Sequence, residues 1–478
     1  MSSYNISAMT FRSRSVVAHA LVVAWMIGLA CDADAQQEFA SSKPNILFII
    51  ADDQSWKDLS VAMDESVPGS KSDYNQTPNI DSIAEAGMRF SNAYAAAPMC
   101  GPSRRALHTG LTSARVEFSE SASEVEANAT TLGEVMQSAG YATAHFGKWS
   151  PGAPETGLEF YDTSDGAKTN SDGNTGDPNN PKDIFGITER AIEFMEESVN
   201  EGRPFYMQLS HFAPHVAITA LDATIDKWKS IKPGKVHTDP AYAAMHEDLD
   251  NGIGMLLEKL RDLGVERNTF VIYTSDHGQT INLSPNLPLK YGKGSLWEGG
   301  MRVPFIVSGP GITPGTSSRA RVVSLDLFPT FAELAGGTAP DGLEGGSLLP
   351  VLRNAGDGEV QRAGEGLVFH FPQPSGQPNS RGVSSIYLGD YKLMRFYDTE
   401  EVLLFDIHND LGEQQNLADQ MPDRVKDMQR RMTSYLDSVN ATIPTPESLE
   451  NDRAAGRGAG MGRGMGGNAA MGMGERGN

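Results

Sequence analysis

The chain has 478 residues, of which 39% are hydrophobic and 21% are charged, and this composition is typical of a folded protein rather than a disordered one. Because this length exceeds the usual size of one domain, we expect one large domain with a smaller one attached. The formal net charge is −22, and so acidic a surface argues against nucleic acid or anionic membranes as partners.

The first 35 residues have the layout of a signal peptide. Arg12 and Arg14 precede the apolar run VVAHALVVAWMIGLA, and the tripeptide 33–35 (ADA) fits an A-x-A cleavage site. A membrane anchor would need about 20 apolar residues, and this run is shorter. We therefore expect residues 1–35 to be removed and the mature protein to be periplasmic or extracellular, without stable membrane insertion. Lipid attachment at Cys31 is the alternative, although a glycine stands where such sites have a branched residue.

The next part of the chain, residues 36–345, alternates between predicted strands and predicted helices. The strands are expected at 44–53, 141–147, 204–212, 269–276 and 303–309, and the helices at 81–90, 103–112, 131–140, 186–199 and 244–264. Continuous apolar strands that alternate with helices indicate a large, mostly parallel sheet covered by helices on both faces. The predicted fold class of this domain is therefore α/β.

From about residue 346 the pattern changes. The short strands LVFHF, SSIYLG, YKLMRFY and VLLFDI follow one another without long helices between them, and a helix is predicted over 421–439. This order predicts a smaller C-terminal subdomain, residues 346–445, with an antiparallel sheet and one helix. Residues 446–478 are rich in glycine and methionine and are predicted to be a disordered tail, with a methionine-rich metal site as the alternative.

Reactive side chains follow four of the predicted strands. Ligands bind at the carboxyl ends of the strands in open α/β sheets. The residues at those ends are Asp52 and Asp53, Lys148, His211 and His215, and Asp276 and His277. The carboxylates of Asp52, Asp53 and Asp276 are suitable ligands for Ca²⁺ or Mg²⁺. Zinc is disfavoured, since the sequence has no cysteine cluster.

Cations and a single cysteine accompany these acids. A metal held by carboxylates, together with Arg104, Lys148 and Lys293, would form a site for a tetrahedral oxyanion. Cys100 precedes a predicted helix, whose N-terminus favours developing negative charge, so its thiolate is a candidate nucleophile. After removal of the leader it is the only cysteine, and it therefore has no disulfide partner within the chain.

Cys100 lies in CGPSR, which resembles the C-x-P-S-R motif of the type I sulfatases, members of the alkaline phosphatase-like superfamily. Further segments resemble that family in its own order, over about residues 44–440: PNILFIIADDQ, TPNIDSIAEAGMRFSNAYAAAPMCGPSR, YATAHFGKW, TSDHG, YGKGSLWEGGMRVPFIV and LFDIHNDLGEQQNLAD. The resemblance implies that a formylglycine-generating enzyme oxidises Cys100 to Cα-formylglycine.

The resemblance also implies a mechanism and residue roles. The aldehyde hydrates to a diol, one oxygen attacks sulfur to give a sulfated enzyme, and the second hydroxyl then loses its proton and sulfate is expelled. The implied metal ligands are Asp52, Asp53, residue 100, Asp276 and His277. Arg104 would stabilise the diol, while Lys148 and Lys293 would bind sulfate oxygens. His215 would contact the sulfate and assist the leaving oxygen.

The chain departs from the family pattern at two places. Ser150 stands where the family has a histidine that is assigned to the second diol hydroxyl. Because serine is a poor general base near neutral pH, either His211 or water replaces that histidine, or the aldehyde regenerates slowly. Val216 and Ala217 follow His215 without the family's usual proline, which affects the shape of the loop more than the chemistry.

The predicted substrate is a sulfate ester of a carbohydrate, with an aryl sulfate as the alternative. Segment 368–379 occupies the region where related enzymes place a substrate-facing histidine, so His370 is a candidate substrate-binding residue. A strand-end histidine without a function explains His370 equally well. Two other functions stay open: a phosphate or phosphonate ester hydrolase of the same superfamily, and a glycan-binding protein on a degenerate scaffold, which Ser150 alone supports.

Overall fold

The structure is a computed structural model, and it describes residues 43–149, 156–162, 175–281, 283, 285–377 and 379–454. The predicted signal peptide, Ser150 and residues 455–478 of the predicted tail lie outside the described residues. Within the described ranges, no helix combines the length and the apolar composition needed to cross a membrane.

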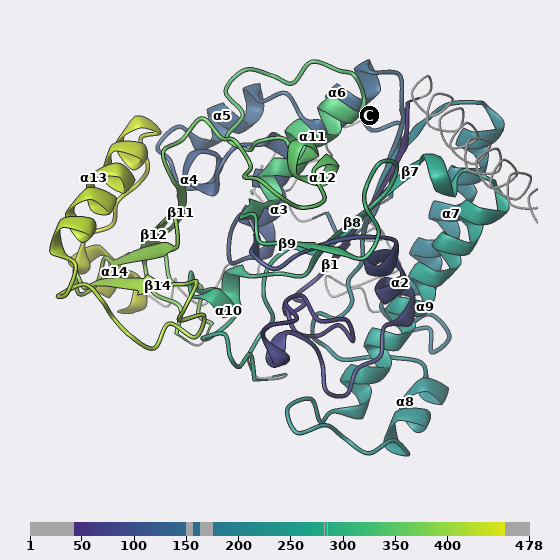
Figure 1. Cartoon of the computed structure of the whole chain (residues 1–478), viewed down its shortest axis with the longest axis horizontal. Coiled ribbons are helices and arrows are strands. Elements are labelled where there is room, and N and C mark those ends of the chain that lie inside the picture. The colour runs from purple at the N-terminus through teal and green to yellow at the C-terminus, as the bar shows by residue number, and fades with distance from the viewer. Residues whose placement is uncertain are drawn as a thin grey trace, which may run out of the picture. The chain divides into compact units, whose positions relative to one another are not determined.

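An eight-stranded sheet forms the centre of the main domain, in the order β5-β4-β6-β1-β7-β8-β2-β9 (Figure 1). Its strands are β1 (Asn45–Ala51), β2 (Gly87–Phe90), β4 (Ala142–Gly147), β5 (Phe160–Asp162), β6 (Phe205–Ser210), β7 (Thr269–Ser275), β8 (Phe305–Ser308) and β9 (Thr316–Ser318). Strands β4, β6, β1 and β7 are parallel neighbours, whereas β8 is antiparallel to both β7 and β2. The sheet is therefore mostly parallel, as predicted, with one reversed strand.

Strand β1 explains why the sheet carries helices on both faces. All seven of its residues are buried, and alternate side chains of a strand point to opposite faces. Leu47 and Ile49 belong to one apolar cluster with α2 (Pro78–Ala86), α7 (Ile184–Asn200) and α9 (Pro240–Asp262). Ile46 and Phe48 belong to the other, with α6 (Leu132–Ser138), α11 (Leu327–Leu334) and α12 (Leu349–Arg353). The continuous apolar sequence of β1 thus corresponds to a strand enclosed by two helical layers.

The C-terminal subdomain has the predicted antiparallel sheet, in the order β11-β12-β13-β14. Its strands are β11 (Leu367–Phe371), β12 (Val383–Leu388), β13 (Tyr391–Phe396) and β14 (Val402–Asp406). Helix α13 (Pro422–Ser438) packs against this sheet through Met428, Met432 and Leu436. Figure 1 shows this subdomain in yellow-green beside the main domain.

The remaining elements are short. They are β3 (Ala93–Tyr94), α3 (Cys100–Thr109), α4 (Ser113–Val116), α5 (Ala122–Asn128), α8 (Asp222–Lys229), α10 (Glu298–Met301), β10 (Val322–Val323) and α14 (Pro446–Ala454), with the 3₁₀ turns η1 (Pro68–Ser70), η2 (Pro181–Asp183), η3 (Glu266–Asn268) and η4 (Ser324–Asp326).

Two predicted boundaries are wrong. The helix predicted over 81–90 ends at Ala86, and residues 87–90 form β2. Gly87 permits this change, because a Cβ at that position would lie 2.2 Å from the Val307 carbonyl oxygen of the neighbouring strand. The tail predicted from residue 446 begins with helix α14 instead, since Thr445 and Ser448 each accept the other's backbone N–H and Leu449 is buried.

Candidate active site

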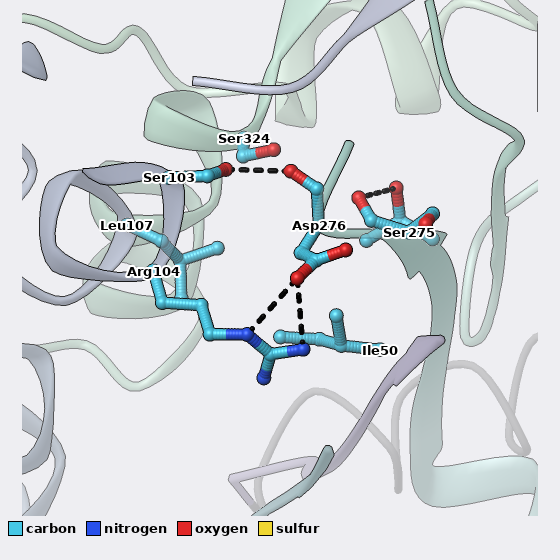
Figure 2. A pocket seen from close by; sticks show the side chains of 8 residues that line it. Ile50, Ser103, Arg104, Leu107, Ser275, Asp276 and Ser324 are labelled. Atoms are coloured by element: carbon cyan, nitrogen blue, oxygen red, sulfur yellow. Dashed lines mark hydrogen bonds and ion pairs between the residues drawn. The ribbon is translucent and has the colours of Figure 1, made fainter. Parts of the chain in front are cut away.

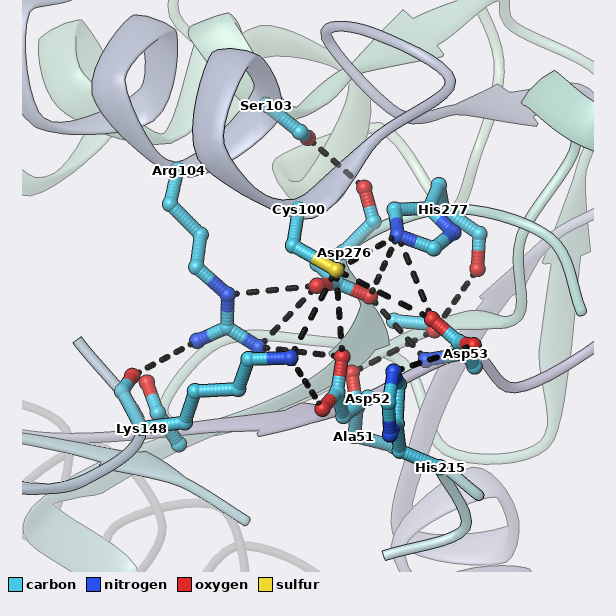
Figure 3. A network of polar contacts seen from close by, with 12 residues as sticks. Ala51, Asp52, Asp53, Cys100, Ser103, Arg104, Lys148, His215, Asp276 and His277 are labelled. Carbon is cyan, nitrogen blue, oxygen red and sulfur yellow. Dashed lines mark hydrogen bonds and ion pairs between the residues drawn. The ribbon is translucent and has the colours of Figure 1, made fainter. Parts of the chain in front are cut away.

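The carboxyl ends of the parallel strands bring the predicted site residues together (Figure 3). Asp52 and Asp53 follow β1, Lys148 follows β4, and Asp276 and His277 follow β7. Cys100, the first residue of α3, faces them from the other side. The expectation that these side chains meet at one edge of the sheet is met.

A sharp turn after β1 presents both acids to the same point. Asp53 has a φ of 61°, a left-handed conformation that is uncommon for a residue other than glycine. Its backbone N–H donates to Asp276 Oδ1 at 3.1 Å, and the N–H of Asp52 donates to the Ala213 carbonyl at 3.1 Å. Bonds from two neighbouring strand ends thus fix this conformation, which is the situation in which backbone strain persists at functional sites.

The sulfur of Cys100 lies at the centre of the cluster. Its Sγ is 3.1 Å from His277 Nε2, 3.5 Å from Lys148 Nζ, and 3.6 Å from both Lys293 Nζ and Asp52 Oδ1. Cys100 is half-buried, whereas these partners are buried. It also begins a ten-residue helix, whose N-terminus favours negative charge on the atom there. Position 100 is therefore a partly accessible point of a largely enclosed polar site.

The cations and acids of the site form buried pairs. Lys148 Nζ lies 2.5 Å from Asp52 Oδ2, and Lys293 Nζ lies 2.7 and 2.8 Å from the two oxygens of Asp53. Burial by itself would raise the pKa of Asp52, but Lys148, His215 and Arg104 outweigh it and hold that pKa well below its usual value. The same competition, chiefly with Lys293, lowers the pKa of Asp53. Both carboxylates are therefore ionised at neutral pH and available to a cation.

Four side chains could share one metal ion. The donor atoms of Asp52, Asp53, Cys100 and His277 all lie within 4.8 Å of one another. Two carboxylates suit a hard cation such as Ca²⁺ or Mg²⁺, whereas a thiolate does not. The donor set therefore fits a hard cation best if position 100 carries oxygen rather than sulfur.

Asp276, which was also predicted to be a ligand, is adjacent to this donor group but is not part of it. Arg104 Nε and Nη2 each lie 3.1 Å from Asp276 Oδ2, and Oδ1 accepts the Asp53 N–H. The carboxylate is thus already engaged on both oxygens. Burial by itself would lower the pKa of His277, but Asp276 and Cys100 outweigh it and raise that pKa to about 9.

Arg104 links helix α3 to two strand ends. Besides its pair with Asp276, it donates from Nη1 to the Lys148 carbonyl at 2.9 Å. The neighbouring Ser103 donates from Oγ to the Asp276 carbonyl at 2.6 Å. A small buried cavity lies beside these contacts, and its walls include Leu107 and Ser324 (Figure 2). Arg104 therefore fixes the orientation of α3, and with it Cys100, in addition to any contact with a substrate.

Two further predicted residues stand around the same point. His215 Nε2 lies 3.7 Å from Asp53 Oδ2, and its side chain is 15% exposed. Lys293 is held on its loop by an N–H bond to the Gln279 carbonyl at 2.9 Å. The next residue, Gly294, has a φ of +79°, and a Cβ there would lie 2.3 Å from Ser375 Oγ. The loop after β11 thus reaches the backbone beside Lys293.

His370 and His211 lie apart from this cluster. The ring of His370 is buried and contacts Ser384 Oγ at 2.6 Å and the Thr442 carbonyl at 3.1 Å. These contacts favour the structural explanation of His370, and the neighbouring loop, rather than His370, approaches the site. His211 is fully buried, its ring nitrogens have no hydrogen-bond partner among the described residues, and burial lowers its pKa to about 4.

Sequence reasoning missed several polar residues of the site. Thr280 Oγ1 lies 3.5 Å from Asp53 Oδ2, and Asn286 contacts three of the segments that carry site residues. Thr280 lies two residues after the TSDHG segment, so its position in the sequence was a usable signal. Nothing in the composition around Asn286 distinguishes it from an ordinary turn residue.

Comparisons with known proteins agree with this geometry. The sulfatase family model matches residues 44–337, and a model of the C-terminal region of N-sulphoglucosamine sulphohydrolase matches residues 290–442. A sulfatase of Formosa agariphila is 29% identical over 84% of this chain and 90% of its own length. Human N-acetylgalactosamine-6-sulfatase is 31% identical over 66% of each chain.

A solved structure shares the fold. The crystal structure of Ps i-CgsB in complex with k-i-k-neocarrahexaose superposes with a TM-score of 0.70 and 25% identity, covering 87% of this chain and 98% of that one. The family match spans more than half of the chain and includes the whole cluster around Cys100. The chain therefore belongs to the sulfatase family, with its alkaline phosphatase-like fold, and is a sulfuric ester hydrolase.

Proposed function

We propose that the protein removes sulfate from a sulfated carbohydrate, with position 100 as the nucleophile. The convergence of two acids, a histidine and two lysines on the Sγ of the half-buried Cys100 carries this proposal. The carbohydrate is supported by relatives whose names or titles refer to sugars, N-acetylgalactosamine-6-sulfatase and the neocarrahexaose complex. An aryl sulfate is the alternative substrate.

Position 100 acts as Cα-formylglycine, made from Cys100 by a formylglycine-generating enzyme. Two observations support this modification. Cys100 lies in CGPSR and is the only cysteine of the described residues. Its Sγ also occupies a donor set that suits oxygen better than sulfur.

A Ca²⁺ ion, or Mg²⁺, would be held by Asp52, Asp53, His277 and residue 100, with Asp276 beside them. When bound, it would supply Lewis acidity that favours an ionised oxygen at position 100 and neutralises charge on the sulfate. The chain's own cations act on the same charge. Lys148 and Lys293 flank position 100 and would bind sulfate oxygens, in a site where enclosure strengthens each attraction.

His215 is suited to the leaving oxygen. It stands at the edge of the cluster near Asp53, and its side chain is partly exposed, so a departing alcohol could reach Nε2. Arg104 keeps α3, and therefore residue 100, in place. His211 is not proposed to replace the family histidine at Ser150, because its ring is enclosed and makes no hydrogen bond to the described residues.

Export through a signal peptide of residues 1–35 completes the proposal. It is supported by the arginines before an apolar run and by the ADA tripeptide. Amino-terminal sequencing of the protein from its native host should begin at or near Gln36. A mature protein that begins at Met1 would contradict export by cleavage.

The decisive experiment combines a modification readout with an activity readout. Mass spectrometry of the tryptic peptide FSNAYAAAPMCGPSR (90–104) should show the mass of an aldehyde at residue 100, and the modified protein should release sulfate from sulfated glycans. Cys100→Ala should release none. A fully modified protein that binds a sulfated glycan without releasing sulfate would be a glycan-binding protein, and faster release from aryl phosphate would favour a phosphate ester hydrolase.

A further inference from the structure

The side chain of Asn286 joins three segments of the site. It is 4% exposed, and its Oδ1 accepts from Ser55 Oγ at 2.7 Å and from Gln279 Nε2 at 3.4 Å. Its Nδ2 donates to the Tyr291 carbonyl at 2.8 Å and to the Gly299 carbonyl at 3.2 Å. Since a carboxamide offers two donors and two acceptor sites, these four bonds use its full capacity.

Each of the first three partners is close to a site residue in the chain. The partners lie two residues after Asp53, two residues after His277 and two residues before Lys293. The first two segments carry Asp53 and His277, which belong to the donor group. The third carries Lys293, which pairs with Asp53. One amide therefore connects the three segments whose residues converge on position 100.

The backbone around Asn286 is itself held firmly. Lys57 Nζ donates to the carbonyls on either side of it, to Pro285 at 2.9 Å and to Leu287 at 2.8 Å. Gln279 is fixed in turn by the hydroxyl of Tyr242, which donates to its Oε1 at 2.7 Å. The backbone of Asn286 is therefore held in place, so its side-chain hydrogen bonds can fix the three segments relative to one another.

We propose that Asn286 is a positioning residue, which sets Lys293 relative to Asp53 and residue 100. Its donor bond to Tyr291 holds the segment of Lys293 against the segments of Asp53 and His277. Lys293 Nζ is 3.6 Å from Cys100 Sγ, and displacements of about 1 Å at such a group can lower rates about 100-fold. The positioning role of Asn286 in catalysis rests on the proposed function, in which Lys293 binds a sulfate oxygen.

Asn286→Asp tests the donor bonds selectively. The carboxylate keeps the two acceptor contacts but places a negative oxygen against the Tyr291 and Gly299 carbonyls. Asn45→Asp is a matched control, because Asn45 is also buried and joins β6 and β7 through Phe205 N and Thr269 Oγ1, at the opposite end of β1 from Asp52. Both variants lose buried amide donors, but only one borders the site.

The first measurement is kcat/KM on an aryl sulfate, per molecule carrying the aldehyde at residue 100, together with the melting temperature. We expect Asn286→Asp to lower kcat/KM about 10- to 100-fold, mainly through kcat. Asn45→Asp should change kcat/KM less than about twofold, even if its melting temperature falls as far as that of Asn286→Asp. Equal activity losses in the two variants would overturn the proposal.

A double-mutant cycle shows whether the effect acts through Lys293. In a Lys293→Met background, Asn286→Asp should lower the remaining kcat/KM less than about threefold, because the group that it positions is gone. An undiminished effect in that background would overturn the proposal. A conservative variant, Asn286→Ser, should retain more activity than Asn286→Asp, because it removes the repulsion of the two carbonyls.

Alkylation of unmodified Cys100 separates this proposal from the proposed function. In protein made without the modifying enzyme, the rate at which iodoacetamide labels Cys100, followed on peptide 90–104, should fall severalfold in Asn286→Asp and not in Asn45→Asp. If wild type releases no sulfate but this difference is seen, the proposed function fails and the positioning role stands. If the alkylation rate is unchanged, the positioning role fails.

Discussion

The described residues include two buried clusters that each pair acidic side chains with cationic ones. At the active site, Asp52 and Asp53 pair with Lys148 and Lys293. The second, here called the C-terminal ion cluster, pairs two acids with two cations: Glu298, Glu413, Arg302 and Lys392. All of these side chains are buried. Burial and pairing of charges therefore do not distinguish the site.

The two clusters differ in which atoms their charged side chains approach. In the C-terminal ion cluster, Lys392 Nζ lies 3.1 Å from Glu298 Oε1 and 2.7 Å from Glu413 Oε1, and the hydroxyls of Tyr94 and Tyr387 donate to Glu298. Each group is thus directed at another member of the network. At the active site both lysines also approach the sulfur of Cys100, a residue that is only half-buried. Convergence on a partly exposed residue is what marks a reactive site, and four experiments test this contrast.

The largest expected effect is loss of turnover without loss of folding. Cys100→Ala should lower the rate of sulfate release by at least about 10³-fold, because other groups cannot replace the nucleophile. The melting temperature should change by only a few degrees, since the side chain that is removed is small and only half-buried. The measurement is sulfate release beside a thermal unfolding curve, with Met99→Leu as the neighbouring control. Substantial activity in Cys100→Ala would show that another group attacks the ester.

The C-terminal ion cluster should show the opposite behaviour. Lys392→Met leaves two buried carboxylates without their shared cation, and removal of one partner from a buried network destabilises proteins by about 3–5 kcal/mol. Activity per folded molecule should stay within about threefold of wild type. Denaturant unfolding measures the first effect, with the exposed Lys426→Met as control. A selective loss of activity would mean that this cluster also serves the reaction.

Metal binding should depend on one cluster only. Ca²⁺ at about 100 times its dissociation constant should stabilise the protein by about 2.7 kcal/mol, since it binds only the folded state. Asp53→Asn should remove this stabilisation, whereas Glu413→Gln should leave it unchanged. Thermal unfolding with Ca²⁺ and with a chelator measures it. Persistence of the shift in Asp53→Asn would place the ion elsewhere.

The strand-end rule accounts for what the sequence could predict about this site. It identified Asp52, Asp53 and Lys148 because carboxyl ends of parallel neighbours share one edge. The rule predicts where a residue lies relative to the sheet but not which way its side chain points. His211 follows a strand end, yet its ring is fully buried and makes no hydrogen bond to the described residues. Lys293 lies in a loop rather than at a strand end, so this rule does not place it, and the family resemblance was needed to assign it to the sulfate oxygens.

Other features depend on contacts between distant segments, which a single sequence does not reveal. The role of Asn286 rests on partners up to 231 residues away along the chain. The change from helix α2 to strand β2 depends on how closely Gly87 approaches β8. The C-terminal strands were predicted from their apolar pattern, yet the contacts of His370 depend on Thr442, which comes after the last of them.

The smallest expected effect is a pH dependence confined to the C-terminal ion cluster. Burial raises the pKa of Glu413 to about 7, with Glu298 adding to the rise and Lys392 opposing it. The folded state therefore binds one proton more than the unfolded state between about pH 4.3 and pH 7, so this group lowers the free energy of unfolding as pH rises through that window.

Glu413→Gln removes that proton equilibrium. The free energy of unfolding of the variant minus that of wild type should therefore increase from pH 5 to pH 8, by on the order of 1 kcal/mol. Urea unfolding at both pH values measures it, and the exposed Glu359→Gln should show no such trend. A difference that decreases toward pH 8 would mean that Glu413 is ionised and stabilising in the folded protein. The C-terminal ion cluster would then be electrostatically equivalent to the active site, and only the accessible atom at residue 100 would separate them.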